Sequence, residues 1–106
     1  LLNASSQNKI TLQKIQELCC ENPAKIFGIK NKGFIKEGYD ADFTVIDINL
    51  LKKVEKKDIK SKCGWSPYEG KILKGWPIMT IIRGNIVFEN GRINNSFKGN
   101  EVEFKD

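Results

Sequence analysis

The chain has 106 residues, which is enough for one compact domain or for a part of a larger one. It carries 18 basic and 13 acidic side chains, for a formal charge of +5, and it contains no histidine. The missing histidine excludes Ser-His-Asp and Cys-His catalysis within the chain, together with zinc sites that need an imidazole ligand.

The start of the chain predicts a part of a longer polypeptide. Position 1 is a leucine, and the only methionine is Met79. The first residues resemble no targeting peptide, and no apolar stretch approaches the roughly 18 residues of a membrane span. The three cysteines, Cys19, Cys20 and Cys63, fit neither a disulfide framework nor a metal knuckle, so we expect free thiols in the cytoplasm, with one of the adjacent pair buried.

The first predicted element is a helix that begins after a polar, aperiodic segment at residues 1–10. Thr11 has the side chain of an N-cap, and apolar residues follow it at helical spacing. We expect this helix to end near Glu21, because Pro23 disfavours helical geometry at the residue before it.

A second, shorter helix is predicted directly afterwards. Asn22 would be its N-cap, Pro23 its first residue and Gly28 its C-cap in a left-handed conformation. Ala24, Ile26 and Phe27 would supply its buried face.

From residue 33 the apolar pattern changes to period two. Residues 38–41 predict a tight turn, and residues 42–47 predict a strand. Phe43 and Val45 would share one face of the strand, and apolar residues also lie on the other. We therefore expect cover on both faces.

A lysine-rich segment and a glycine-containing loop follow the strand. Residues 52–62 hold six lysines against two acidic residues, which predicts a solvated connection. Residues 63–70 contain two glycines and one proline and predict an ordered loop. Large aromatic side chains in and after this loop are predicted packing anchors, namely Trp65, Tyr68 and Trp76.

The last elements are predicted strands. Residues 77–89 form a hairpin in which Gly84-Asn85 supplies the positive φ angles of the turn. Asn90-Gly91 predicts a further turn, and residues 102–104 a final strand. The expected fold class is α+β: two N-terminal helices followed by a mostly antiparallel β-domain.

Few side chains are candidates for chemistry. Asp40, Asp42 and Asp47 could bind a cation or transfer protons, but they fit turn and strand-end positions better. Ser66 has no base to activate it, and Lys74 fits an exposed lysine beside a turn. We therefore assign no catalytic, cofactor-binding or metal-binding residue to this chain.

The order of four motifs is more informative than any one residue. It comprises N-P-A-K-I-F-G-I at residues 22–29, G-F-I-K-E-G-Y-D-A-D at 33–42, S-P-Y-E-G at 66–70 and T-I-I-R-G-N-I-V at 80–87. The same order resembles the C-terminal region of the cyclic amidohydrolases. The segment at residues 63–77, with its Lys-Gly-Trp-Pro end, most resembles the dihydroorotases among them.

This resemblance implies that the chain is the C-terminal part of an enzyme with two domains. Residues 1–29 would be the last helical segment of a TIM barrel, and residues 30–106 the C-terminal part of a small β-sandwich domain. The family's metal ligands, its bridging lysine and its catalytic aspartate match nothing here, so the resemblance places them, with zinc, upstream of residue 1. Dihydroorotases interconvert N-carbamoyl-L-aspartate and L-dihydroorotate in pyrimidine biosynthesis.

The resemblance also implies partners and leaves alternatives open. The partners would be the remaining part of the same polypeptide, further copies of the enzyme and, as a candidate, aspartate transcarbamoylase; neither nucleic acid nor a membrane is expected. The parent could instead be an allantoinase, a dihydropyrimidinase or an inactive dihydroorotase-like subunit. The alternative from a different class is a small basic β-domain that binds nucleic acid.

Overall fold

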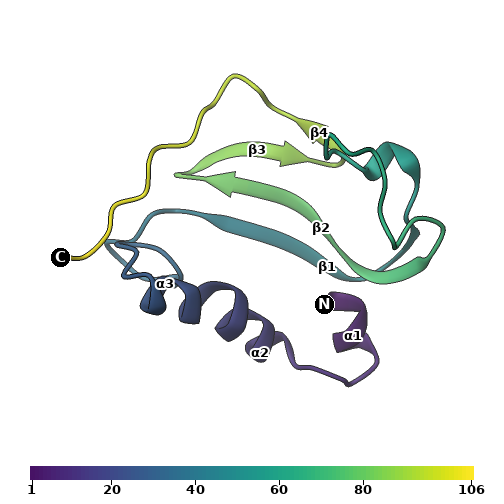
Figure 1. The fold of residues 1–106 in the computed structure, drawn as a ribbon, viewed down its shortest axis with the longest axis horizontal. Coiled ribbons are helices and arrows are strands. Elements are labelled where there is room, and N and C mark those ends of the chain that lie inside the picture. The colour runs from purple at the N-terminus through teal and green to yellow at the C-terminus, as the bar shows by residue number, and fades with distance from the viewer.

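The computed structural model describes residues 1–106, in which helices precede a four-stranded antiparallel sheet (Figure 1). The strands are β1 (Phe43–Lys53), β2 (Ile72–Ile82), β3 (Asn85–Glu89) and β4 (Arg92–Ile93), and they lie in this order across the sheet. The predicted α+β class is confirmed. None of the helices has the length and apolar character needed to cross a membrane.

The N-terminal residues form a short helix, α1 (Leu2–Ser6), where the sequence predicted no regular element. This helix lies against β2. The Asn3 side chain accepts a hydrogen bond from the Lys74 N–H at 2.9 Å, and a Cβ added to Gly75 would lie 2.7 Å from the Cβ of Leu2. The prediction was wrong because a contact with a distant strand, and not local periodicity, holds this turn.

The main helical segment consists of α2 (Leu12–Gln16), the π-helical turn η1 (Glu17–Glu21) and α3 (Asn22–Ile26). The predicted N-cap is confirmed, since the Lys14 N–H donates to Thr11 Oγ1 at 3.1 Å. These three elements follow one another without a break along one side of β1 (Figure 1).

The predicted end of the first helix near Glu21 is wrong. Asn22 has helical angles, φ −63° and ψ −45°, and its side chain makes no capping hydrogen bond. A proline inside an α-helix would clash with the carbonyl four residues earlier. The wider π turn before Pro23 moves those carbonyls, so the helical path continues.

The end of α3 has the predicted glycine cap. Gly28 has φ +63°, the Ile29 N–H donates to Ala24 O at 2.9 Å, and the Gly28 N–H donates to Lys25 O at 3.3 Å. This pair of bonds is a Schellman motif. Of the three residues expected to be buried here, only Ala24 is, because Ile26 and Phe27 face solvent.

Strands β1 and β2 are longer than predicted because they pair with each other along most of their lengths. Lys52 lies opposite Leu73, so the start of the lysine-rich segment belongs to β1 and is not a free connection. Pro77 lies inside β2 opposite Ile46, beside a register shift between Val45 and Ile46. A proline has no N–H for the ladder, which explains why the pairing is irregular there.

Two-residue turns join β2 to β3 and β3 to β4. In the first turn Arg83 and Gly84 have φ +46° and +78°, so the predicted Gly84-Asn85 turn is one residue out of place. Asn85 instead pairs with Ile82 as the first residue of β3. The predicted turn at Asn90-Gly91 is confirmed.

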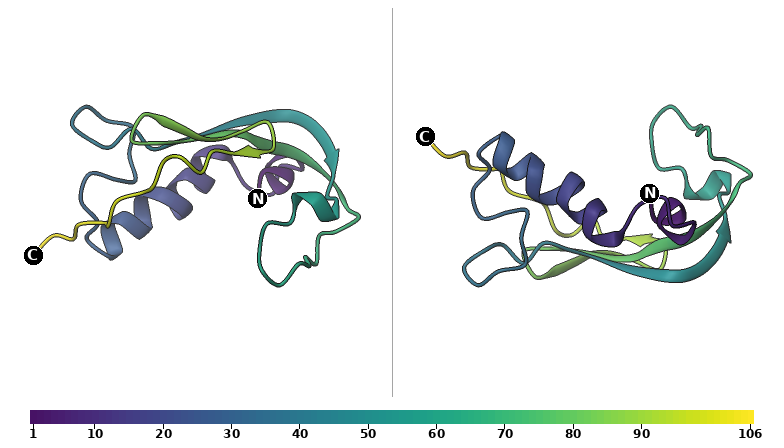
Figure 2. Two further views of the ribbon diagram at one scale, coloured as in Figure 1. Left: turned by 90° about the horizontal axis from the view of Figure 1, so that it is seen from above. Right: turned by 90° about the horizontal axis from the view of Figure 1, so that it is seen from below.

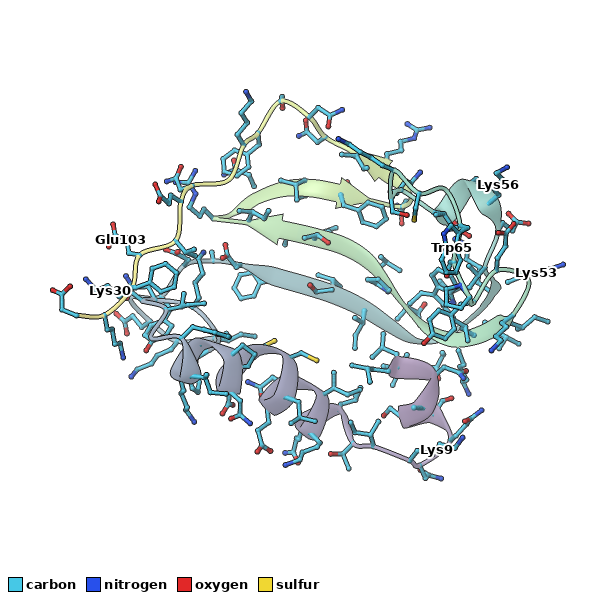
Figure 3. The ribbon with its side chains drawn as sticks, viewed as in Figure 1. Lys9, Lys30, Lys53, Lys56, Trp65 and Glu103 are labelled. Atoms are coloured by element: carbon cyan, nitrogen blue, oxygen red, sulfur yellow. The ribbon has the colours of Figure 1, made fainter.

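The C-terminal segment returns to the end of α3. The predicted strand at residues 102–104 is a single bridge between Phe104 and Ile29. The Lys30 N–H donates to Glu103 O at 2.9 Å, which holds the tail beside the helix end (Figure 3).

The helices and the loop before β2 project from the same side of the sheet, and no helix covers the opposite side (Figure 2). Only Ala24 and Val54 are buried. The expected cover on both faces of β1 is therefore wrong for this chain, since Val45 is 38% exposed. The helices and the sheet do not close on each other, because a groove lined by side chains from both layers lies between them.

Candidate functional site

The most connected polar group joins the loop before β1 to the β2–β3 turn. Lys32 Nζ lies 2.9 Å from Asp40 Oδ2 and 2.5 Å from Asp42 Oδ2. The other oxygen of Asp42 accepts the Arg83 N–H at 2.9 Å, and the Gly84 N–H donates to Ala41 O at 3.0 Å. We call these residues the Asp42 clamp. It fastens the loop before β1 to the β2–β3 turn at one end of the sheet.

The clamp is charged on both sides at neutral pH. Partial burial raises the pKa of the Asp42 carboxyl, but hydrogen bonds from Lys32 and the Arg83 N–H outweigh it and lower that pKa. The hydrogen bond to Asp42, followed by the one to Asp40, raises the pKa of Lys32. Since an ammonium group already sits between the two carboxylates, the pair is poorly suited to hold a metal cation.

The other predicted candidates lie apart from this clamp. Asp47 accepts the Asn49 N–H at 3.0 Å, Ser66 Oγ accepts the Tyr68 N–H at 3.1 Å, and Lys74 is exposed. The structure contains no group of three His, Cys, Asp or Glu side chains that could hold a metal ion. The residues of this chain therefore do not fit the zinc centre that the family resemblance implies.

Sequence reasoning missed Lys32, which is the centre of the clamp. Nothing in its neighbours along the chain marks it, because both of its partners come from beyond the turn at residues 37–38. Only the path of the backbone brings the three side chains together.

All three cysteines are exposed, so the expected burial of one of Cys19 and Cys20 is wrong. Cys63 differs from them in its surroundings. Its sulfur lies 3.1 Å from Ser61 Oγ, and this hydroxyl, together with backbone hydrogen bonds, lowers the pKa of the thiol.

A groove of about 1410 Å³ lies between the helical segment and the sheet. The C-terminal tail, from Gly99 to Glu103, borders it. Apolar side chains from both layers line it, among them Leu12, Ile15, Ala24, Phe43, Ile46 and Ile81. These apolar side chains line an open groove at the place where a closed hydrophobic core would be expected.

The opposite end of the molecule carries the lysine-rich segment. Lys52 Nζ lies 2.7 Å from Asp58 Oδ1 and 4.5 Å from the centre of the Trp76 ring, and the short helix η2 (Lys56–Asp58) follows β1. Of the predicted packing anchors, Trp76 is half-buried, whereas Trp65 and Tyr68 are 64% and 56% exposed.

The arrangement of helices, sheet and motifs agrees with known proteins. The model of the amidohydrolase family matches residues 1–87. The chain belongs to the amidohydrolase family. The predicted resemblance to cyclic amidohydrolases is thereby confirmed.

The relatives of this amidohydrolase chain are much longer than the chain itself. Over 102 residues it is 47% identical to a dihydroorotase from Pyrococcus furiosus, a match that covers 96% of the chain and 24% of that protein. It is 35% identical over 94 residues to an L-hydantoinase from Paenarthrobacter aurescens, covering 88% of the chain and 20% of that protein. The chain thus spans a fifth to a quarter of these relatives.

A solved structure supports the same architecture. The L-hydantoinase (dihydropyrimidinase) from Arthrobacter aurescens superposes with a TM-score of 0.81 at 33% identity. This likeness covers 88% of the amidohydrolase chain and 21% of that structure. The helices and the antiparallel sheet are therefore a shared frame of the family.

Proposed function

We propose that this chain is the C-terminal part of a dihydroorotase, which opens and closes the ring of L-dihydroorotate. The observation that carries the proposal is the 47% identity with a dihydroorotase over 102 of its 106 residues. The L-hydantoinase match is weaker, at 35% identity over 94 residues. In this proposal the parent enzyme acts in the cytoplasm, in pyrimidine biosynthesis, as an oligomer.

The role of residues 1–106 in that enzyme is structural. Residues 1–29 would end a barrel domain, and residues 30–106 would complete a small β-domain. The uncovered groove and the exposed face of the sheet support this, because apolar surface of that extent calls for cover by another layer. The Asp42 clamp would keep the β2–β3 turn in place while the rest of the protein packs on the sheet.

The chemistry would belong to the remainder of the polypeptide. A divalent metal, when bound there, supplies a Lewis acid and a water of lowered pKa for attack on the ring amide. Residues 1–106 contain no group of three His, Cys, Asp or Glu side chains that could hold a metal ion. We therefore expect residues 1–106 alone to be inactive.

A hydantoinase or dihydropyrimidinase is the second candidate. The observation in its favour is the TM-score of 0.81 with the L-hydantoinase structure. Shared architecture does not distinguish substrates, because substrate choice depends on residues at the active site. The two candidates therefore differ in predicted substrate and not in predicted fold.

The test is a substrate comparison on the complete polypeptide that contains residues 1–106, purified with its metal. Dihydroorotate, dihydrouracil and a substituted hydantoin are supplied in turn, and ring opening is followed by absorbance. We expect kcat/KM for dihydroorotate to exceed the others by about a hundredfold or more, as for a site built to bind the extra carboxylate. The reverse ranking would favour the second candidate, and a metal-loaded protein that opens none of the rings would contradict both.

A further inference from the structure

The loop between η2 and β2 is held in shape by its own hydrogen bonds. The Gly70 N–H donates to Val54 O and the Val54 N–H donates to Lys71 O, both at 2.9 Å, and Val54 is buried. Further along, the Gly64 N–H donates to Ser61 O at 3.1 Å. The loop is therefore anchored at its base and ordered within.

This ordered loop presents its aromatic side chains to solvent. Trp65 and Tyr68 are 64% and 56% exposed, and each offers a large apolar surface. A rigid loop that holds exposed aromatic side chains loses little conformational entropy when they are covered. Such residues are typical anchors of protein interfaces.

The segment that carries the two aromatic residues is rich in lysine. Residues 52–74 contain eight lysines and three acidic residues, a surplus that equals the formal charge of +5 of the whole chain. Two of the acidic residues are already paired, Asp58 with Lys52 and Glu55 with Lys57. Trp65 lies at the same end of the molecule as Lys53 and Lys56 (Figure 3). A complementary surface would carry carboxylates around an apolar pocket.

Single-stranded nucleic acid fits this surface less well than protein does. Bases need free aromatic faces for stacking. Here Lys71 Nζ lies 5.5 Å from the centre of the Tyr68 ring and Lys52 Nζ lies 4.5 Å from that of Trp76. In two of the three nearby aromatic rings, one face thus already has an ammonium group of the chain over it.

We infer that residues 52–71 form a docking surface whose anchor is Trp65, and that it binds an acidic-rimmed apolar pocket on the remainder of the amidohydrolase polypeptide. The remainder is favoured over another protein because the match with the Pyrococcus furiosus relative covers only 24% of that protein. A polypeptide of that length would have enough further chain to cover the loop. The inference rests on the proposed membership of a longer enzyme, and it does not depend on the substrate.

The test measures whether Trp65 is covered in the complete polypeptide. Iodide quenching is recorded for the unaltered protein and for Trp65→Phe, and the difference isolates Trp65. We expect its quenching constant to be about tenfold below that of free N-acetyltryptophanamide, since anchors lie where water is excluded. A constant within about twofold of the free compound would overturn the inference.

A second measurement needs no substitution at Trp65. Hydroxyl-radical footprinting of the unaltered protein reports oxidation at Trp65 directly, and oxidation as rapid as that of the unfolded chain would also overturn the inference. A third experiment tests the charge by comparing Lys56→Glu with Lys98→Glu. Lys98 is an exposed lysine outside the docking surface. We expect only Lys56→Glu to lower the Tm, and the difference in Tm between the two variants should shrink in high salt. Equal effects of the two substitutions would contradict an acidic rim around the pocket.

The test of the docking surface can fail or succeed independently of the test of the proposed function. An active dihydroorotase with a fully quenchable Trp65 would keep the function and overturn the docking surface. An inactive protein with a protected Trp65 would do the reverse.

Discussion

The two ends of the molecule use the same residue types in opposite ways. At the Asp42 clamp, Lys32 and Asp42 are 28% and 31% exposed, and Asp42 also accepts a hydrogen bond from the Arg83 N–H in the β2–β3 turn. At the lysine-rich end, Lys57 and Glu55 are 75% and 49% exposed, and both belong to the short helix η2 or its N-cap. The first end stabilises the chain, whereas the second leaves its charge available for a partner.

The largest expected effect tests how tightly the clamp end is packed. Gly33 has φ +91°, and a Cβ there would lie 2.7 Å from Ala24 Cβ and 2.8 Å from Cys20 O. Gly33→Ala should lower the free energy of unfolding by about 2–5 kcal/mol, because backbone strain adds to overpacking. Urea unfolding followed by circular dichroism measures the loss.

Gly38→Ala is the matched control for that substitution. Gly38 has φ +84°, and nothing lies within 4 Å of an added Cβ. Only the strain of the left-handed conformation remains, so the loss should be about 1 kcal/mol. Equal losses at the two positions would show that the close approach of Gly33 to the helix is not tight in solution.

The next effect tests the clamp itself. Asp42→Ala removes the acceptor for the Lys32 ammonium and for the Arg83 N–H, and should cost about 1.5–3 kcal/mol. Asp42→Asn keeps an oxygen for the Arg83 N–H and should cost less. Amide hydrogen exchange at Arg83 should accelerate in the alanine variant only.

The clamp also predicts a pH dependence. Because the folded pKa of Asp42 is lowered, its stabilising contribution is complete above the unfolded pKa of about 3.9 and is lost as the pH falls through the folded value. The stability difference between the unaltered chain and Asp42→Asn should therefore shrink as the pH falls below about 4. A difference that stays constant to the lowest pH would place the stabilisation elsewhere.

The smallest effects are expected at the lysine-rich end. Lys52→Ala removes a 2.7 Å ion pair and the contact with the Trp76 ring, and should cost about 0.5–1 kcal/mol. Lys57→Ala removes only a solvent-exposed pair and should leave the urea midpoint unchanged. A loss at Lys57 as large as that at Asp42 would erase the contrast between the two ends.

Local chemistry predicted the features that depend on neighbours in sequence. The Thr11 N-cap, the Gly28 C-cap and the Asn90-Gly91 turn all occur as expected, because each is decided by the conformations and hydrogen bonds of a few adjacent residues. The Arg83-Gly84 turn was misplaced by one residue, since Asn85 favours positive φ more than Arg83 does, but the strand register pairs Asn85 with Ile82 and leaves Arg83 in the turn.

Features that depend on residues distant in the chain could not be predicted from the sequence. Helix α1 forms on β2. The length of β1 depends on β2, and Lys32 finds its carboxylates across a turn. No periodicity along the chain carries this information, because the partners come from other elements.

By itself the sequence determined the α+β class, the Thr11 and Gly28 caps, the order of family motifs and the absence of any histidine for a metal centre. Those properties depend only on residue types and on short spacings along the chain. Only the tertiary structure decided that Asp42 clamps a hairpin turn, that the predicted core is an open groove, and that Trp65 faces outward among lysines. Burial and ion pairing depend on which distant surfaces meet, and that is a property of the folded path and not of local spacing.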